Sequence, residues 1–197
     1  MGKAERTREF IVEKTAPVFN RKGYAGTSMS DLTESTGLTK GAIYGNFENK
    51  DEVAIAAFEY NLLRMVDQVK DLQSTHPTAI GKLQAYITVY RRGLFKPTLA
   101  AGCPIVNTGV DADDTHPQLR KKVEEAVNSW HRSISAIIHQ GIRSGEMKDG
   151  VDVPAFASLM IAMIEGGITV SKISGDKSYL TQSLDHLEKL IDLQLKK

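Results

Sequence analysis

The sequence predicts an all-α protein of about nine helices, in which a small N-terminal three-helix domain precedes a larger helical domain. Apolar residues recur at helical spacing along most of the chain, and no stretch of useful length alternates as a strand would. Residues 27–50 read as two short helices around a tight turn, and the second helix is polar and small-sided on one face. That layout is typical of a helix-turn-helix, which places one helix in the major groove of DNA. We therefore expect a helix-turn-helix DNA-binding domain over residues 1–50 and a second helical domain over residues 51–197.

The composition is that of an ordinary globular protein. The chain has 197 residues, of which 41% are hydrophobic and 25% are charged. Its net charge is only +1, and the first fifty residues carry eight Lys and Arg against six Asp and Glu. This charge balance is too weak to indicate nucleic-acid binding by itself. DNA binding is therefore inferred from the helix-turn-helix alone.

Cysteine usage and the N-terminus indicate a cytoplasmic protein. The single cysteine, Cys103, excludes an internal disulfide and a cysteine-cluster metal site, and it suits a reducing compartment. The N-terminus is charged and has no apolar core of a signal peptide. The longest apolar stretch, residues 156–164, is too short to span a membrane. We therefore expect no membrane partner, and the five histidines form no convincing metal set, so no metal or cofactor is expected.

Local signals mark the first helices. A helix is expected over residues 5–22, with a kink at Pro17, because proline has no backbone N–H to donate. Ser28 and Asp31 fit a capping box that begins the next helix at about residue 29. Gly37 then supplies the turn, where a positive φ costs glycine little.

The second helix of the motif follows directly. Thr39 is placed to cap a helix that runs to about Asn46, and Asn49 is placed to cap the helix after it. Leu38, Ile43 and Phe47 are expected to point inward and hold the two motif helices together.

Six further helices are expected after residue 49. Their ends are set by prolines, glycines and changes in apolar spacing. They run over about residues 50–73, from His76-Pro77 to near Lys96-Pro97, from Pro104 to about Asp111, from Pro117 along a wide apolar face to Ile142, from Asp152-Val153-Pro154 to Gly175, and from Leu180 to Leu195.

Residues 37–50 match a known pattern, Gly-Val-Ser-Lys-Gly-Thr-Leu-Tyr-x-x-Phe-x-x-Lys, almost position for position. On this basis the first fifty residues resemble the DNA-binding domain of the tetracycline-repressor (TetR) family, and the chain length and helix layout suit that family. The matching residues are Thr7-Arg8-Glu9, Phe19-Asn20-Arg21-Lys22-Gly23-Tyr24, Thr27-Ser28-Met29 and, above all, Gly37-Leu38-Thr39-Lys40-Gly41-Ala42-Ile43-Tyr44-Gly45-Asn46-Phe47-Glu48-Asn49-Lys50.

The resemblance implies a ligand-responsive transcriptional regulator and no enzyme. Such a regulator would be a homodimeric repressor that leaves its palindromic double-stranded operator when a small apolar or electrophilic effector binds. Two other classes remain as alternatives: a small all-α enzyme, for which no nucleophile–base pair or metal cluster is found, and an interaction module that has lost DNA binding, against which the intact motif argues.

The residue types in the motif suit contact with DNA. Gly41 and Ala42 are small enough to let the helix approach the base edges, and Ala42 could touch a thymine methyl. Lys40 could donate to guanine or to phosphate. Ser28 is placed for a phosphate contact.

Further DNA contacts are implied by the family pattern. Tyr44 and Lys50 match its phosphate-contacting tyrosine and lysine. The alternatives are a half-buried structural ring for Tyr44 and a solvated charge for Lys50. Asn46 either contacts DNA or only ends its helix. Arg6 and Arg8 either form a minor-groove arm or are solvated.

The last two helices are the expected dimer surface, over residues of about 153–195. By resemblance they form a four-helix interface with a second copy. The small residues Gly166 and Gly167 permit close helix contact there, and the leucines of the last helix add an apolar stripe that includes Leu184 and Leu187. The alternative for that stripe is ordinary core.

A ligand pocket is expected in the second domain. Aromatic and sulfur side chains suggest a plastic apolar cavity, although each is also a good core residue. Glu165, alone in an apolar helix, is a pocket carboxylate, an interface hydrogen-bonder or a group that reaches solvent. The candidate ligand residues are Tyr60, Tyr86, Tyr90, Phe95, Cys103, Asn107, Trp130 and Met163.

Cys103 is the sharpest sensor candidate. It precedes a helix N-terminus, whose dipole favours a thiolate. The run from Gly102 to Thr108 resembles a Gly-Cys-x-x-x-Asn-Thr segment of one branch of the family, in which a cysteine senses electrophiles. The alternative is a small buried apolar residue.

Overall fold

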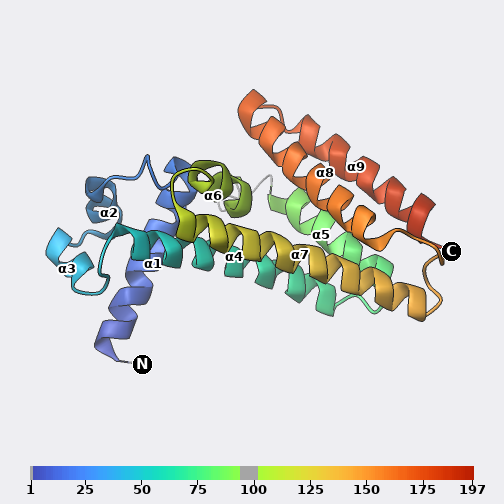
Figure 1. The fold of residues 1–197 in the computed structure, drawn as a ribbon, viewed down its shortest axis with the longest axis horizontal. Helices are drawn as coiled ribbons and strands as arrows, with labels where there is room; N and C mark the ends of the chain where they lie inside the picture. Colours follow the sequence, from blue (N-terminus) through green and yellow to red (C-terminus); the bar gives the residue numbers. More distant parts are fainter. Residues whose placement is uncertain (1, 94–101) are drawn as a thin grey trace. The chain divides into compact units, whose positions relative to one another are not determined.

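A computed structural model describes residues 2–93 and 102–197, and within these residues it contains nine α-helices, one short π-helix and no strand (Figure 1). The predicted all-α fold is confirmed. The elements are α1 (Lys3–Lys22), α2 (Met29–Thr36), α3 (Lys40–Tyr44), α4 (Lys50–Ser74), α5 (Ala79–Gly93), α6 (Pro104–Ala112), α7 (Pro117–Arg143), α8 (Val153–Ser174), α9 (Ser178–Leu190) and the π-helix η1 (Ile191–Leu195).

The helices belong to two compact units. The first unit comprises Met1–Met65 and Ala101–Glu125, and the second comprises Val66–Ala100 and Ala126–Lys197. The first unit thus contains α1, α2, α3 and α6, while α4 and α7 each have residues in both units. The functional boundary expected at residue 50 remains a prediction.

The predicted capping signals are confirmed in the helix-turn-helix. The Ser28 hydroxyl accepts from the Asp31 N–H at 3.2 Å, and the Asp31 carboxylate accepts from the Ser28 N–H at 2.8 Å. Gly37 has φ of +67°, and its N–H donates to the Thr33 carbonyl oxygen. The Thr39 hydroxyl accepts from the Ala42 N–H at 3.2 Å. These local bonds satisfy donors at the start of both helices, so the sequence itself sets where α2 and α3 begin.

A small apolar core joins the first three helices. Ile43 and Phe47 are buried as predicted, while Leu38 is only half-buried. α1 continues through Pro17 and ends at Gly23, where φ is +73°. The buried apolar residues of α1 to α3 and of the turn after α3 are Ile11, Ala16, Phe19, Leu32, Ile43 and Phe47.

The second unit contains the α8–α9 pair, whose helices lie side by side (Figure 1). The pair is close at Gly167, where a Cβ would lie 3.0 Å from Leu180 Cδ1. Two hydrogen bonds add to the contact: the Leu180 N–H donates to Ser171 Oγ at 2.9 Å, and Ser183 Oγ donates to the Met163 carbonyl oxygen at 2.7 Å.

The leucine stripe of the last helix is core of the protomer. Leu184 and Leu187 are both fully buried, and Leu180 is nearly so. The expectation that this stripe forms the dimer surface was therefore wrong, because its side chains already pack inside one chain. Gly167 likewise serves contact within the protomer. The carboxylate of Glu165 is buried as well, which rules out the reading in which it reaches solvent.

Candidate nucleic-acid interface

α3 is a five-residue helix that presents small and polar residues outward. Lys40 and Gly41 are exposed, and a Cβ on Gly41 would meet only the Thr39 hydroxyl, 4.0 Å away. Ala42 and Tyr44 are half-buried, and the Lys40 ammonium lies 5.8 Å from the centre of the Tyr44 ring. Within the described residues, Lys40 and Gly41 are therefore open to close approach by a ligand.

The end of α3 is held by Asn46 and Arg8. Asn46 Nδ2 donates to the Ala42 carbonyl oxygen at 2.9 Å, which supports its helix-ending role. The Asn46 carbonyl oxygen accepts from Arg8 Nη1 at 2.6 Å. The same guanidinium lies 4.0 Å from the centre of the Phe47 ring and pairs with Glu52 at 2.6 Å. Three elements, α1, the turn after α3 and α4, thus meet at one side chain.

A minor-groove arm is one expectation for Arg8. The structure places Arg8 within α1, where its guanidinium forms an ion pair with Glu52. The Glu48 N–H and, to a lesser extent, Arg8 hold the pKa of Glu52 below its ordinary value, so the carboxylate stays charged. Sequence spacing alone could not predict that Arg8 bonds to the turn after α3, because 38 residues separate Arg8 from Asn46.

Lys50 begins α4 and has an internal partner. Its ammonium donates to the Tyr24 carbonyl oxygen at 2.7 Å and lies 4.3 Å from the centre of the Tyr24 ring. Ser28, the other predicted phosphate contact, is exposed at the start of α2. Both residues lie at helix N-termini, where backbone N–H groups favour an anion.

Tyr24 links the loop after α1 to α4 and to His116, the residue before α7. Its hydroxyl donates to the Asp51 carboxylate, and its ring packs edge-on against His116, with ring centroids 4.6 Å apart. The bond to Asp51 and, secondarily, burial raise the pKa of Tyr24 to about 12. His116 is buried, and its Nε2 lies 3.7 Å from Asp51 Oδ1.

α6 is tied to the loop that precedes the helix-turn-helix. Asp111, near the end of α6, accepts from the Tyr24 N–H at 2.5 Å and from the Ala25 N–H at 3.3 Å. Gly23 leaves room for this carboxylate, because a Cβ there would lie 2.8 Å from Asp111 Cγ. The sequence pattern did not single out Asp111, since it reads as one of several acidic residues in a loop.

A second tie joins α6 to α1. Asn107 Nδ2 donates to the carbonyl oxygen and to Oδ1 of Asn20, each at 3.0 Å. Asn20 Nδ2 in turn donates to the Gly102 carbonyl oxygen at 3.1 Å. Asn107, expected as a ligand contact, thus bonds to the helix that supports the DNA-binding motif.

The remaining ligand candidates fall in both units. Tyr86, Tyr90 and Trp130 come together in the second unit. Trp130 stacks on both tyrosines, with ring centroids 6.2 Å from Tyr86 and 5.8 Å from Tyr90. Tyr86 shares a 3.0 Å hydrogen bond with Ser133, and burial raises the pKa of its hydroxyl. Among the described residues the buried Trp130 Nε1 has no hydrogen-bond partner.

Met163, Tyr60 and Cys103 are the remaining candidates that the structure describes. Met163 is half-buried on α8, and Phe95 lies outside the described residues. Tyr60 belongs to the first unit and its hydroxyl accepts from Arg64 at 3.1 Å. Cys103 is fully buried at the start of α6, with Sγ 4.0 Å from Met65 Sδ.

Known proteins share both the domains and the fold of this chain. A model of bacterial regulatory proteins of the tetR family matches residues 11–57, and a model of the tetracycline repressor-like C-terminal domain matches residues 79–187. These two matches cover the helix-turn-helix and most of the second domain.

Solved structures extend the likeness to the whole chain. A TetR-family regulator from Cytophaga hutchinsonii is 44% identical with a TM-score of 0.89, and the match covers 97% of this chain and 96% of that one. A TetR regulator from Chloroflexus aurantiacus is 36% identical with a TM-score of 0.93, over 100% and 99% of the two chains. FadR from Bacillus subtilis, solved with stearoyl-CoA, is 23% identical with a TM-score of 0.75 over 93% and 96%. With the exposed α3 and its capped turn, these matches make the chain a DNA-binding transcriptional regulator of the TetR family.

Proposed function

We propose that the protein is a cytoplasmic homodimeric repressor that binds a palindromic operator and leaves it when a small apolar or electrophilic effector binds. The observation that carries the DNA-binding half is the exposed N-terminal end of α3. Lys40 and Gly41 face solvent there, while Arg8 and Asn46 fix the other end of the helix. A rigid helix with a small, cationic tip suits the major groove.

The proposed DNA contacts are of two kinds, contacts to base edges and contacts to phosphates. Lys40, Gly41 and Ala42 face the bases, with Lys40 on guanine or phosphate and Ala42 against a thymine methyl. The remaining contacts fix the position of the helix on the phosphates. The residues proposed to contact phosphates are Ser28, Tyr44, Asn46 and Lys50. For Lys50 the internal bond to Tyr24 holds the ammonium at the α4 N-terminus, where a phosphate is favoured.

A dimer supplies the second half-site. Two heads spaced by about one helical turn, ~34 Å, or a multiple of it read a palindrome with two-fold symmetry. We place the contact between copies on α8 and α9, within residues 153–195. The buried leucines take no part in it; the exposed apolar residues of α8 do, which include Leu159, Val170 and Ile173.

For release from DNA, effector binding must change the position of the DNA-binding helices α2 and α3. The bonds of Asp111 to the loop after α1, and of Asn107 to Asn20, support α6 as the element that transmits this change. A shift of α6 would move the loop that precedes α2 and so change the position of α3. An effector causes release only if it binds the DNA-incompetent arrangement more tightly.

The effector class is proposed from two features. The stacked rings of Tyr86, Tyr90 and Trp130 suit an apolar ligand, and the buried Trp130 N–H suits an acceptor atom on it. The long-chain acyl-CoA bound by the Bacillus relative makes stearoyl-CoA a reasonable first probe. An electrophile could instead alkylate Cys103, whose burial means that α6 must open first.

A gel-shift assay tests this function. The wild type should retard a duplex from the upstream region of its own gene and leave a scrambled duplex free. N-ethylmaleimide should release the wild type from the duplex and should leave Cys103→Ser bound to it. Equal binding by alkylated and unalkylated wild type, with mass spectrometry confirming the modification, would remove the cysteine route and leave a noncovalent effector. Equal binding of both duplexes would contradict the proposal that the protein recognises a specific operator in this region.

A further inference from the structure

His116 caps the start of α7 through its side chain. Its Nδ1 accepts a hydrogen bond from the Leu119 N–H at 3.2 Å, and its carbonyl oxygen accepts from the Arg120 N–H at 3.0 Å. His116 is only 6% exposed, so the bond to Leu119 is shielded from water. The imidazole therefore satisfies one of the N–H groups that a helix leaves without an internal acceptor at its start.

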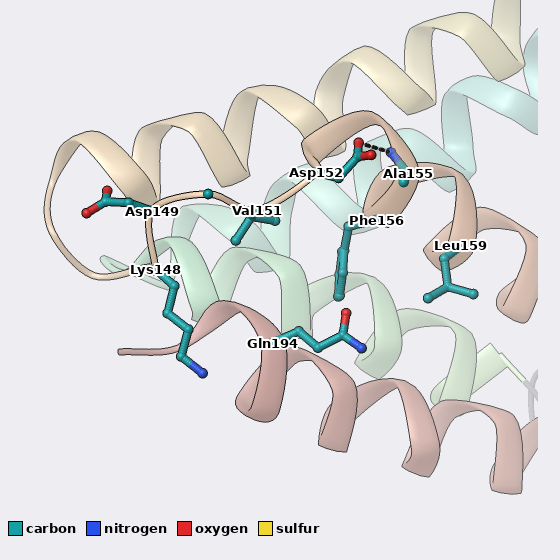
Figure 2. Close-up of a pocket in the computed structure, with 9 residues that line it drawn as sticks. Lys148, Asp149, Val151, Asp152, Ala155, Phe156, Leu159 and Gln194 are labelled. Atoms are coloured by element: carbon teal, nitrogen blue, oxygen red, sulfur yellow. Dashed lines mark hydrogen bonds between the residues drawn. The ribbon is translucent and has the colours of Figure 1, made fainter.

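Other helices of the chain are capped by side chains that keep their acceptor oxygen at every pH near neutrality. The Ser28 and Thr39 hydroxyls cap α2 and α3. At α8 the Asp152 carboxylate accepts from the Ala155 N–H at 3.0 Å, beside a groove that Phe156 lines (Figure 2). A histidine differs, because both ring nitrogens become donors when the ring takes up a proton. A modest fall in pH can therefore remove the α7 cap but not these caps.

The bond to Leu119 fixes which nitrogen of His116 carries the proton in the neutral ring. Nδ1 accepts from an N–H, so the proton is on Nε2. Nε2 is buried and has no hydrogen-bond partner among the described residues. Asp51 Oδ1 lies 3.7 Å from it, which is too far for a hydrogen bond but within the range of an ion pair. The neutral ring thus satisfies α7 and leaves its own donor unsatisfied.

Charged and titratable groups surround His116 from three other elements. The Asp51 carboxylate faces Nε2 from α4. Tyr24, in the loop after α1, packs its ring against the imidazole and donates its hydroxyl to Asp51 Oδ1. Asp111 of α6 is bonded to the Tyr24 N–H, and Lys50 of α4 to the Tyr24 carbonyl oxygen. One Asp51 oxygen therefore lies near two donors, and only the Tyr24 hydroxyl is hydrogen-bonded to it.

We propose that His116 is a pH-dependent positioning residue for DNA binding: protonation of its ring breaks the α7 cap, draws Asp51 away from Tyr24 and weakens operator binding. This inference rests on the phosphate contact of Lys50 in the proposed function. The Tyr24 carbonyl oxygen and ring hold the Lys50 ammonium at the start of α4. A displacement of Tyr24 therefore displaces that ammonium as well.

The protonated ring favours a different arrangement for two reasons. Its Nδ1 becomes a donor that faces the Leu119 N–H, which is also a donor, at a helix N-terminus that disfavours positive charge. Its Nε2 gains a full electrostatic attraction to Asp51, 3.7 Å away. The ring therefore leaves the cap and moves toward the carboxylate that now accepts from the Tyr24 hydroxyl.

His116 is the one histidine of the first unit, which contains the helix-turn-helix. The second unit contains the other four, at positions 76, 131, 139 and 186. Protonation of a histidine in general adds positive charge and strengthens attraction to phosphates. Weaker operator binding at lower pH is therefore opposite to the general electrostatic trend, and it indicates a specific group.

Operator affinity at two pH values tests the proposal in the full-length protein. Fluorescence anisotropy is measured with a labelled duplex from the upstream region of its own gene, at about pH 8 and about pH 5.5 and at constant ionic strength. The wild type should bind about 5- to 20-fold more weakly at the lower pH, a usual size for coupled sites.

Two histidine variants assign the effect. His116→Asn keeps a cap acceptor that does not titrate, so it should bind like the wild type at the higher pH and lose no affinity at the lower pH. His139→Asn, exposed on the same helix, is the matched control and should keep the wild-type response. Circular dichroism at both pH values reports whether each protein stays folded.

Asp51→Asn tests the partner of the protonated ring. The amide oxygen can still accept from the Tyr24 hydroxyl, but the negative charge that attracts the imidazolium is lost. The fold-change in operator affinity between the two pH values should therefore be smaller than in the wild type. This variant decides the question by itself if His116→Asn does not fold, because an undiminished fold-change would overturn the proposal.

The outcomes separate the role of His116 from the proposed function. Equal operator affinity of the wild type at both pH values would overturn the role of His116 and leave the proposed function standing. An equal loss of affinity in His116→Asn, or a loss of helix content in the wild type at the lower pH, would overturn it too, because another group or unfolding would then be responsible. Absence of sequence-specific binding at both pH values would overturn both.

Discussion

The helix-turn-helix and the α8–α9 pair are fixed by different kinds of interaction. In the helix-turn-helix, side chains bond to backbone groups three residues away, as Ser28 does with Asp31 and Thr39 with Ala42. In the α8–α9 pair, apolar side chains and a glycine meet across two helices. The first kind of interaction is local and carries its own sequence signature, whereas the second depends on which face of a helix is already covered.

The largest difference should appear between a buried and an exposed residue of the α8–α9 pair. Leu184→Ala should lower the free energy of unfolding by about 2–5 kcal/mol, because it leaves a cavity in the protomer core. Ile173→Ala should change protomer stability by no more than about 0.5 kcal/mol and should weaken the dimer instead. Urea unfolding at concentrations where the copies dissociate measures the first effect, and light scattering the second. Equal loss of protomer stability in both variants would break the distinction between the two faces.

Arg8 tests whether the helix-turn-helix also depends on contacts distant in sequence. Arg8→Ala removes the bond to the Asn46 carbonyl oxygen and the pair with Glu52, and should cost about 1–2 kcal/mol because both partners are partly exposed. Operator affinity should fall with it. Arg21→Ala, on the same helix and exposed, is the matched control. A variant Arg8→Ala with wild-type thermal stability and affinity would show that local caps suffice.

The bonds from Asp111 of α6 to the loop after α1 should affect effector-induced release of DNA more than they affect stability. Asp111→Ala removes two acceptor bonds at Tyr24 and Ala25, and should cost about 1 kcal/mol of stability. Its main effect should be that N-ethylmaleimide no longer releases bound operator, as measured by gel-shift. Asp114→Ala, an exposed neighbour, should keep the wild-type response. If Asp111→Ala responds as fully as wild type, α6 does not act through this carboxylate.

The smallest effect concerns pH. The pKa of Tyr24 is raised from 10.0 to about 12, so the folded state holds its proton more tightly than the unfolded chain does. Its contribution to stability is therefore complete below pH 10 and is lost as the pH rises toward 12. Tyr24→Phe should lose stability relative to wild type at pH 8, and this difference should shrink between pH 10 and 12. A constant difference in urea midpoint over that range would contradict the bond to Asp51.

Most of the fold could be predicted from the sequence because the capping and turn signals that set the helix ends are local. Gly37, Thr39 and Asn49 each act within four residues of their own position, and all three function in the structure as their types suggest. Pro104 likewise begins α6, and Asp152 caps the start of α8.

The errors came from pairs that are distant in sequence. Periodicity placed Leu184 on an apolar face of α9, but an apolar face is equally suited to core and interface, and only the position of α8 decides between them. Gly166 and Gly167 are adjacent and identical in type, yet one faces open space and the other faces Leu180. The role of Asp111 depends on a backbone N–H 87 residues away.

The salt dependence of operator binding tests the central claim, that α3 and the start of α4 dock on DNA, most directly. Fluorescence anisotropy gives the slope of log K against log salt for the wild type and for Lys50→Ala, with Lys70→Ala, an exposed lysine of α4, as the control cation. Lys50→Ala should weaken binding to all sequences nearly equally and reduce the slope by about one unit per half-site, while Lys70→Ala should match the wild type. Superimposable isotherms for Lys50→Ala and wild type at every salt concentration would contradict the proposed docking.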